Sequence, residues 1–280
     1  MQNKKQPKNK ITIKMKIPVF DKTGKEASKK ELPVQFNEVI RQDLITRAVL
    51  TVQANSRQPY GSDPNAGMMV SAKLSRRRRD YKGSYGIGIA RSPRKIMSHR
   101  GTRFNWVGAL APNTVGGRRA HPPKAERIWD KKLNTKERRF ALRSALSATM
   151  HKDIVKARGH ILPKEFPFLL SNDVENIKKT KDVIDLLFAL GFKEELDRTK
   201  DKIHRSGKGK NRGRPYKVKK SVLFVVSKKC DLNKAAENVS GVEIVTPEHL
   251  NAELLAPGCA IGRLTLYTEG AIDLIEKKFL

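Results

Sequence analysis

The chain concentrates its positive charge in two stretches. Residues 57–127 carry sixteen lysines and arginines against three acidic residues, and residues 201–220 carry nine against one. Residues 221–280 carry six basic and eight acidic residues, so this last part is close to neutral. A surface that served only solubility would mix the two signs. The segregation therefore predicts an ordinary globular domain that carries basic extensions.

The first basic stretch also lacks a regular apolar pattern. It holds nine glycines and six prolines, and its apolar residues follow neither the helical period nor the strand period. Loops of this length are rare unless they are functional. Without a periodic apolar face the segment cannot recover an ordering entropy of roughly 1–2 kcal/mol per backbone residue. We expect it to order only against a partner, with fast amide exchange over 57–127 and protection over 132–280 when RNA is absent.

The total charge indicates what that partner is. The chain has 59 lysines and arginines and 28 acidic residues, a formal net charge of +31. Such a charge repels itself unless a polyanion neutralises it, which favours nucleic acid over an anionic membrane surface. The longest apolar runs, such as 222–226, fall far short of the roughly 20 residues of a spanning helix. No membrane-spanning segment is expected, and the hydrophobic fraction of 38% is enough for a real core.

The cysteines and the N-terminal residues indicate a reducing compartment. Cys230 and Cys259 form no CxxC motif, so neither a disulfide framework nor a zinc site is expected, and each is interpreted as a small buried apolar residue. Residues 1–10 form a lysine-rich tail that no apolar stretch follows, so no secretory signal is expected. The expected location is the cytoplasm.

In the N-terminal part of the domain, 11–56, short strands are expected at 11–20 and 32–36 around a turn at 21–24. Asn37 is the expected N-cap of a helix that leads into the basic stretch. The apolar face expected for that helix consists of Ile40, Leu44 and Ala48.

After the basic stretch, the domain is expected to resume at 132–280. Asn134 and Glu137 have the spacing of a capping box, which predicts the start of a helix over 139–150. Gly159 is its expected stop. The later elements expected are strands at 166–170, 222–226, 242–245 and 263–267, and helices at 173–190, 232–238, 248–255 and 270–279.

Near-continuous apolar strands separated by helices predict a parallel sheet covered on both faces. The predicted fold is therefore an α/β domain, 11–56 with 132–280, built of three layers with a mostly parallel central sheet flanked by helices. A long extended basic loop, 57–131, interrupts it as an inserted arm.

The densest charge in the arm is the run Arg76–Arg79. A charge run is ordinarily a solvated face, but guanidinium groups can bind phosphate through two parallel hydrogen bonds and stay charged at any relevant pH. Neutralisation of the backbone supplies most of the affinity for nucleic acid, so the repeated cations favour phosphate binding. The candidate cations are Arg57, Lys73, Arg76, Arg77, Arg78, Arg79, Lys82, Arg91, Arg94, Lys95, Arg100 and Arg103.

Aromatic residues are interleaved with these cations. Rings beside arginines can stack on unpaired bases, which is the way irregular RNA is recognised. Alternatively, the rings pack locally within the arm, and the sequence favours neither interpretation. The candidate stacking residues are Tyr60, Tyr81, Tyr85, Phe104 and Trp106.

No motif supports catalysis or cofactor binding. The glycine-rich segments 83–88 and 207–210 lack the spacing of nucleotide-binding loops, and the six histidines show no metal-ligand spacing. We therefore expect no cofactor, no metal and no small-molecule substrate. The alternative is an RNA-modifying or RNA-cleaving enzyme, which would need a catalytic cluster at the carboxyl ends of the strands. Those ends offer only Ser227, Thr246 and Thr268.

Two stretches carry a family resemblance: GGRRAHPPKAE at 116–126 and KERRFALRSAL at 136–146. Together with the shorter motifs Asp43-Leu44-Ile45, YGSDP at 60–64, RGR at 212–214 and APG at 256–258, they closely resemble the family of the universal large-subunit ribosomal protein number four, in its archaeal type. The resemblance covers residues 11–280.

The resemblance implies a structural protein and not an enzyme, present in one copy per ribosome. Its expected partners are large-subunit rRNA and neighbouring large-subunit proteins. It implies a role in early subunit assembly, a three-layer α/β fold, and an arm that helps to line the polypeptide exit tunnel with a tip within 76–103. It also places 116–124 and 205–220 against rRNA. The further rRNA-binding residues are Gly116, Gly117, Arg118, Arg119, His121, Lys124, Lys208, Lys210, Arg212, Arg214, Lys217, Lys219 and Lys220.

Overall fold

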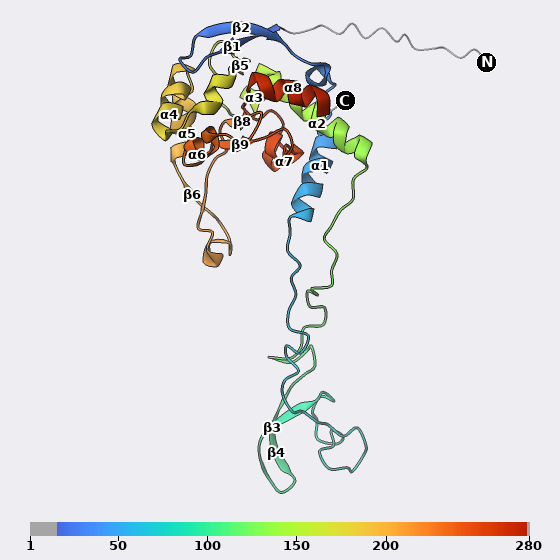
Figure 1. The fold of residues 1–280 in the computed structure, drawn as a ribbon. Helices are drawn as coiled ribbons and strands as arrows, with labels where there is room; N and C mark the ends of the chain where they lie inside the picture. Colours follow the sequence, from blue (N-terminus) through green and yellow to red (C-terminus); the bar gives the residue numbers. More distant parts are fainter. Residues whose placement is uncertain (1–15, 279–280) are drawn as a thin grey trace, which may run out of the picture. The chain divides into compact units, whose positions relative to one another are not determined.

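A computed structural model describes residues 16–278 of the 280-residue chain. The expected tail 1–10, the first part of the expected strand 11–20 and the last residue of the expected helix 270–279 lie outside the described residues. The described chain forms two compact units (Figure 1). We call residues 57–130 the arm unit, and 16–56 with 131–278 the body unit.

The body unit contains two small three-stranded sheets. The first has the order β2-β1-β5, in which β1 runs antiparallel to β2 and parallel to β5. The second has the order β10-β8-β9 and is parallel throughout. A single parallel bridge between Leu170 and Thr268 joins the two. The strands are β1 (Lys16–Phe20), β2 (Glu26–Glu31), β5 (Leu169–Leu170), β8 (Leu223–Val225), β9 (Glu243–Val245) and β10 (Thr265–Tyr267).

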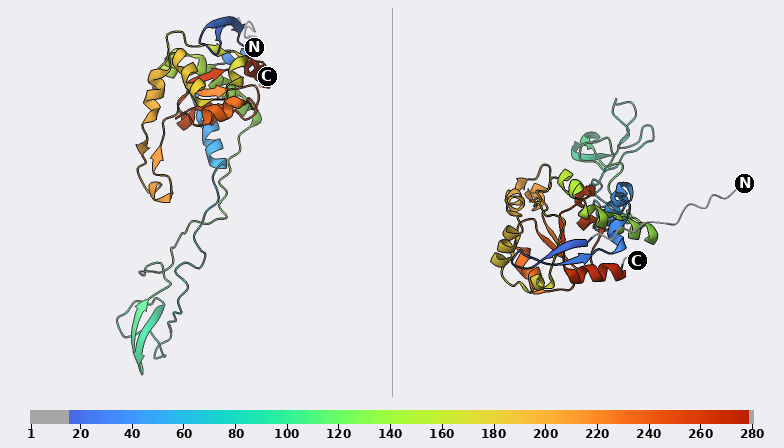
Figure 2. Two further views of the ribbon diagram at one scale, coloured as in Figure 1. Left: turned by 60° about the vertical axis from the view of Figure 1, so that its left-hand side comes forward. Right: turned by 90° about the horizontal axis from the view of Figure 1, so that it is seen from above.

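Helices pack around the inner strands of these sheets, whereas β2 lies at the outside, as Figure 2 shows. All residues of β8 and β10 are buried, and their apolar side chains form the core together with one face of each packed helix. Most of the stability of such helices comes from burying that face, because isolated helices of this length are marginal in water. The helices are α1 (Gln42–Asn55), α2 (Thr135–Met150), α3 (Lys152–Ala157), α4 (Thr180–Ala189), α5 (Lys193–Lys200), α6 (Asp231–Glu237), α7 (Ala252–Leu255) and α8 (Glu269–Lys278), with 3-10 turns η1 (Val34–Asn37), η2 (Asn172–Asn176), η3 (Lys210–Arg212) and η4 (Pro257–Cys259).

The elements after residue 220 lie within a few residues of their predicted positions. The mixed α/β class is confirmed, and so are the buried strands 222–226 and 263–267 in their central residues. The prediction succeeds for 222–226 because all five of its residues are apolar and buried, and for 263–267 because Leu264, Leu266 and Tyr267 are apolar and buried, as in a strand covered on both faces. Helix α2 also starts after Asn134 as predicted, but the Asn134 side chain makes no capping hydrogen bond.

The N-terminal predictions are partly wrong. The second strand is β2, not 32–36, because β2 is an exposed edge strand whose sequence EASKKE has no apolar pattern. Residues 34–37 form a 3-10 turn instead. Asn37 is not a cap, since α1 begins after Arg41. The buried face of α1 is Ile45, Ala48 and Val49. The predicted face of this helix is therefore shifted by about one residue.

Two predictions in the middle of the chain are also wrong. The strand 166–170 shrinks to β5, because Pro167 has no N–H to donate to a ladder. The helix 173–190 is broken into η2 and α4. The break lets the buried Glu175 carboxylate accept hydrogen bonds from the Ser227 backbone N–H at 2.8 Å and from the Thr268 hydroxyl at 2.7 Å. Such a partnership between distant segments leaves no trace in local periodicity.

The arm unit contains a hairpin that the sequence analysis missed. Strands β3 (Arg94–Arg100) and β4 (Arg103–Gly108) pair antiparallel, with a shift of register between Ile96 and Ser98. Exposure alternates along β4, where Phe104 and Trp106 are half-buried and their neighbours are exposed. The expectation that 57–127 has no regular structure is therefore wrong for this segment. The alternation along β4 covers only six residues and is between exposed and half-buried side chains, so it is weak beside the surrounding cations.

Elsewhere in the arm unit two chain segments lie side by side (Figure 1). The Ser62 N–H donates to the Pro123 carbonyl oxygen at 3.0 Å. Gly67 has φ +79°, and a Cβ there would lie 2.6 Å from the backbone of Gly117 and Arg118. Only glycine fits this approach, because a side chain would meet the opposite backbone and the positive φ would strain it.

We expect Gly67→Ala to separate these two segments. The matched control is Gly86→Ala, since Gly86 has φ +82° and a Cβ added to it would meet no atom within 4 Å. Both variants take the conformational strain of roughly 1–2 kcal/mol, but only Gly67→Ala adds a backbone clash. Amide exchange around Ser62 and Arg118 should speed up at least tenfold more in Gly67→Ala. Equal exchange in the two variants would show that the close approach does not constrain the arm unit.

Candidate nucleic-acid interface

The arginine run lies on a small closed loop of the arm unit. The Ser75 N–H donates to the Lys82 carbonyl oxygen at 3.0 Å, and the Gly83 N–H donates to the Asp80 carbonyl oxygen at 3.0 Å. The Asp80 carboxylate accepts from the Ser75 hydroxyl at 2.5 Å and from the Tyr81 N–H at 2.8 Å. These hydrogen bonds lower the pKa of Asp80. The run Arg76–Arg79 is exposed on this loop.

Most of the other predicted arm cations are exposed as well. Arg57, Lys73, Arg91, Arg100 and Arg103 are exposed, whereas the remaining three are half-buried. Arg94 is one of these, since it donates to the Ala90 carbonyl oxygen at 3.2 Å and its guanidinium lies 5.9 Å from the Trp106 ring centroid. The two other half-buried cations are Lys82 and Lys95.

The segment 116–124 forms one wall of an open hollow. The hollow has a volume of about 670 Å³, and the opposite wall is formed by residues of 62–68. Arg118, Arg119, His121 and Lys124 are exposed, so their polar ends are free to meet a ligand. Gly116, with φ +76°, is exposed and Gly117 is half-buried. This predicted binding segment thus combines an exposed cationic surface with a concave one.

The predicted stacking residues contact one another within the arm unit. The Phe104 ring stacks on Trp106 with centroids 5.1 Å apart and meets Tyr81 edge-on at 5.3 Å. The Arg91 guanidinium lies 4.3 Å from the Tyr85 ring centroid. Tyr60 stacks on Trp129 at 5.5 Å. Local packing is therefore present, yet Tyr60 and Tyr81 remain 52% and 57% exposed, which leaves ring surface for a base.

The second basic stretch forms a hairpin of the body unit. Strands β6 (Ile203–His204) and β7 (Tyr216–Lys217) pair antiparallel, and Figure 2 shows the hairpin extending away from the helices of its unit. Arg205 stiffens it, because its side chain donates to the Arg214 and Tyr216 carbonyl oxygens across the hairpin. Every predicted cation of this hairpin is exposed except Lys219, which is half-buried; the exposed ones are Lys208, Lys210, Arg212, Arg214, Lys217 and Lys220.

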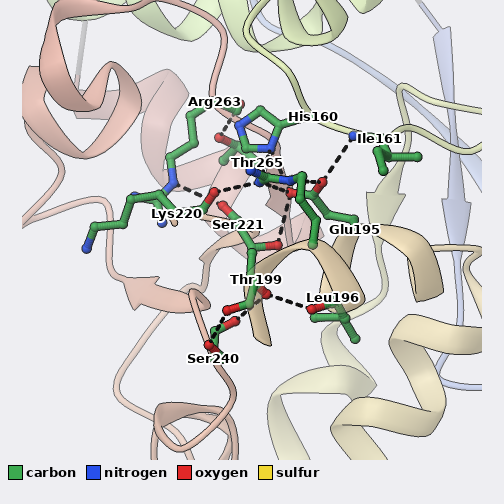
Figure 3. A network of polar contacts seen from close by, with 11 residues as sticks. His160, Ile161, Glu195, Leu196, Thr199, Lys220, Ser221, Ser240, Arg263 and Thr265 are labelled. Carbon is green, nitrogen blue, oxygen red and sulfur yellow. Dashed lines mark hydrogen bonds and ion pairs between the residues drawn. The ribbon is translucent and has the colours of Figure 1, made fainter. Parts of the chain in front are cut away.

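A buried polar network lies where this hairpin joins the body unit (Figure 3). At its centre the Glu195 carboxylate, fully buried on α5, accepts hydrogen bonds from His160 Nδ1 at 2.8 Å, the Ile161 N–H at 3.0 Å and the Ser221 hydroxyl at 3.1 Å. The Arg198 guanidinium donates to both carboxylate oxygens, at 2.9 and 2.7 Å. Such a paired and saturated carboxylate satisfies the condition for burying a charge.

The network connects both ends of the hairpin. Arg198, just before it, also donates to the carbonyl oxygen of Lys220, just after it, at 2.9 Å. Thr199 and Ser240 exchange two hydrogen bonds, at 3.0 and 2.8 Å. The fully buried Arg263 donates to the Ser221 carbonyl oxygen at 3.2 Å. We conclude that the direction in which the hairpin leaves the body unit is set by buried, specific hydrogen bonds.

The protonation states in the network follow from its contacts. Burial alone would raise the pKa of Glu195, but the hydrogen bonds from His160, Arg198 and the Ile161 N–H outweigh it and lower that pKa to about 2. Burial lowers the pKa of His160, with nearby Arg158 and Arg198 acting in the same direction. At neutral pH the network therefore holds an ionised carboxylate and a neutral imidazole that donates from Nδ1.

Four aromatic and cationic residues were missed by the sequence analysis. Arg127 and Trp129 contact each other in the arm unit, with the guanidinium 4.3 Å from the ring centroid. His204 and Tyr216 pack across the basic hairpin with centroids 4.5 Å apart. The signal in the sequence is an aromatic residue one or two positions from an arginine: Trp129 follows Arg127, and His204 and Tyr216 flank Arg205 and Arg214.

Nothing in the described residues resembles a catalytic or metal centre. No cluster of three His, Cys, Asp or Glu side chains suited to a metal occurs within 16–278. Ser227 and Thr268, at the strand ends, bind the Glu175 carboxylate and are part of the fold. Cys230 and Cys259 are free and half-buried. Among the described helices, none combines the length and hydropathy needed to cross a bilayer.

A folded body with a buried apolar core, together with an arm unit and a hairpin that are dense in exposed cations, is typical of nucleic-acid-binding proteins. Comparison with known proteins is consistent with this class. Residues 30–278 match the family described as ribosomal protein L4/L1 family. The chain belongs to this family, and the resemblance seen in its sequence is confirmed.

Similar proteins come from several archaea. The chain is 45% identical to the large ribosomal subunit protein uL4 of Nanoarchaeum equitans, over 95% of this chain and 99% of that protein. It is 45% identical to the protein of the same name from Methanococcoides burtonii, over 94% and 98% of the two chains. The corresponding protein of Archaeoglobus fulgidus is 43% identical, over 93% and 98%. The likeness therefore spans almost the full length of each protein.

Proposed function

We propose that this chain is a structural constituent of the large ribosomal subunit. In this role it binds large-subunit rRNA in the cytoplasm, aids subunit assembly, and helps to line the polypeptide exit tunnel with its arm. The observation that carries the proposal is the near full-length match to archaeal proteins named large ribosomal subunit protein uL4. The exposed cations on the arm unit and the basic hairpin supply the mechanism.

The mechanism is electrostatic and geometric. Each guanidinium or ammonium that meets a phosphate releases condensed counterions, so the summed contacts give affinity without base recognition. The arm unit offers the loop at 76–79 and the hollow at 116–124, and the basic hairpin offers a second set of cations. Partly exposed rings such as Tyr60 and Tyr81 add stacking on unpaired bases. The partners are rRNA and neighbouring proteins of the large subunit. Each ribosome contains one copy of the chain.

The fold proposed for the body unit is a three-layer domain. The bridge between Leu170 and Thr268 aligns the two small sheets in the order β2-β1-β5-β10-β8-β9. Every pairing in that order is parallel except β1 with β2. Helices on the two faces of this sheet would complete the layers. The division into a domain, 11–56 with 132–280, and an inserted arm is supported by the compactness of the two units.

The arm is proposed to gain its final order on rRNA. Outside β3 and β4 its described residues are held mainly by turns and short hydrogen-bonded bridges. The cationic loop 76–79 and the segment 116–124 would then be fixed by their phosphate contacts, with the tunnel-proximal tip within 76–103. The family is structural and not enzymatic, which removes the alternative of an RNA-modifying or RNA-cleaving enzyme.

Sedimentation of tagged protein through a sucrose gradient of cell extract tests this proposal. The protein should travel with large ribosomal subunits at physiological salt and leave them only when salt is raised or the rRNA is digested. Purified protein should also bind a transcript of archaeal large-subunit rRNA more tightly than it binds transfer RNA at the same nucleotide concentration. The two RNAs carry the same charge per nucleotide, so the comparison tests more than charge. Free sedimentation at the top of the gradient, together with equal binding of both RNAs, would contradict the proposal.

A further inference from the structure

Four side chains gather between the two ends of the arm unit's own chain. Arg57 and Tyr60 come from its first residues, and Arg127 and Trp129 from its last. The Arg57 guanidinium carbon lies 3.8 Å from the Trp129 ring centroid, and that of Arg127 lies 4.3 Å from it. The Tyr60 ring stacks on Trp129 at 5.5 Å, with an angle of 16° between the planes. Two guanidiniums are thus held against one indole.

The cluster contains hydrogen-bond donors that have no acceptor among the described residues. Arg57 and Arg127 are exposed, and within residues 16–278 neither guanidinium donates a hydrogen bond or joins an ion pair. A guanidinium stacked on a ring keeps the N–H donors at its edge available for an oxyanion. Trp129 Nε1 is shielded from water and has no acceptor in the described residues. A shielded donor without an acceptor costs about 1–3 kcal/mol.

The cluster borders a hollow of about 410 Å³. Its walls include Tyr60, Pro122, Pro123, Lys124, Arg127 and Trp129, so two rigid proline rings and two cations face the space. The volume falls within the roughly 300–1,000 Å³ of ligand sites. Glu126 also borders the hollow. With Arg57 beside it, the local charge is still positive. The hollow thus combines size, positive charge and unused donors, which together suit an anionic group.

We propose that Arg57, Arg127 and Trp129 form a clamp for a phosphodiester of RNA. The two guanidiniums donate to the non-bridging oxygens of one phosphate, and Trp129 Nε1 donates to an acceptor of the same nucleotide. Trp129 is also a positioning residue, because its ring fixes both guanidiniums before the ligand arrives. A base does not stack on Trp129, since the guanidiniums and Tyr60 already cover its ring. The clamp rests on the proposed function, to which it adds a defined contact.

Filter binding of the full chain to a transcript of archaeal large-subunit rRNA, measured at several salt concentrations, tests the clamp. Arg127→Ala should lower the dependence of log affinity on log salt by about 0.7–0.9, the value of one phosphate contact. Arg127→Lys keeps the charge but loses the planar fork, so the affinity should fall about fivefold at an unchanged slope. Trp129→Leu keeps both arginines, so the affinity should fall about tenfold, again at an unchanged slope. The control is Arg139→Lys, an exposed α2 arginine outside the proposed interface, which should stay within twofold.

The outcomes separate the clamp from the proposed function. Failure of the wild-type chain to bind the transcript would overturn the proposed function. Normal wild-type binding, with Arg127→Ala and Arg127→Lys both indistinguishable from Arg139→Lys, would show that the cluster only packs the ends of the arm unit. If amide exchange shows that Trp129→Leu unfolds part of the arm unit, Trp129→Phe is used in its place to test the role of Trp129. It keeps a ring but removes Nε1–H, and should still bind about threefold more weakly than wild type; equal binding would exclude Nε1 as a donor.

Discussion

Replacing Arg76, Arg77, Arg78 and Arg79 together by alanine is expected to lower the affinity for large-subunit rRNA on the order of a thousandfold at 0.1 M salt. The dependence of log affinity on log salt should fall by about 3, because each lost phosphate contact removes roughly 0.7–0.9. All four side chains are exposed on their loop, which is closed by backbone and Asp80 contacts that the variant retains. The loss should therefore come from binding and not from unfolding. Filter binding over a salt series measures both quantities.

Two controls separate phosphate contact from overall charge. Replacing the same four arginines by lysine keeps the charge, so the slope should stay and the affinity should fall less than about tenfold. The second control removes four charges from exposed lysines of the body unit outside the proposed interface, and it should leave the slope within about 0.5 of wild type. These lysines are Lys22, Lys25, Lys181 and Lys193. An equal effect from both alanine sets would mean that the arginine loop acts only through net charge.

The body unit shows which features of a fold local sequence can predict. Strands such as β8 are apolar at every position because both faces are covered, and this pattern identifies them without knowledge of their neighbours. An edge strand such as β2 is exposed almost throughout, so its residues carry no such pattern. It pairs with β1 through the backbone ladder and an exposed ion pair between Lys16 and Glu31 at 3.8 Å. Tertiary contacts also break the predicted helix at η2, where Glu175 turns inward to reach Ser227.

The candidate interface also has one part that the sequence predicts and one part that only the fold reveals. The cations could be identified from composition, since charge segregation is visible in the sequence and exposure is the normal state of lysine and arginine. Contacts between residues far apart in sequence could not be identified in this way. Arg57 and Trp129 are 72 positions apart, and Glu195 meets His160 across 35 positions. Each partner on its own is an ordinary polar or aromatic residue, so only the folded chain reveals the clamp and the network.

The buried network at the basic hairpin leads to the second large expected effect. Glu195→Gln should lower the free energy of unfolding of the body unit by about 3 kcal/mol, as expected when one partner of a buried charge network is removed. A glutamine has one acceptor oxygen, and its amide N–H groups would face the Arg198, His160 and Ser221 donors that the carboxylate now accepts. Chemical denaturation monitored by circular dichroism measures the loss. Faster amide exchange at Ser221 would show that the hairpin has lost its anchor.

Glu194→Gln is the matched control, because Glu194 is the neighbouring residue on α5 and is exposed. It should change the free energy of unfolding by no more than about 0.5 kcal/mol. Acid provides an independent check. The pKa of Glu195 is lowered to about 2 from an ordinary value of 4.5, so the ionised carboxylate stabilises the fold fully above pH 4.5 and loses this contribution as the pH falls towards 2. The stability difference between wild type and Glu195→Gln should therefore shrink over that window. A difference that stays constant from about pH 5 to about pH 2.5 would mean that the charge of Glu195 does not stabilise the network.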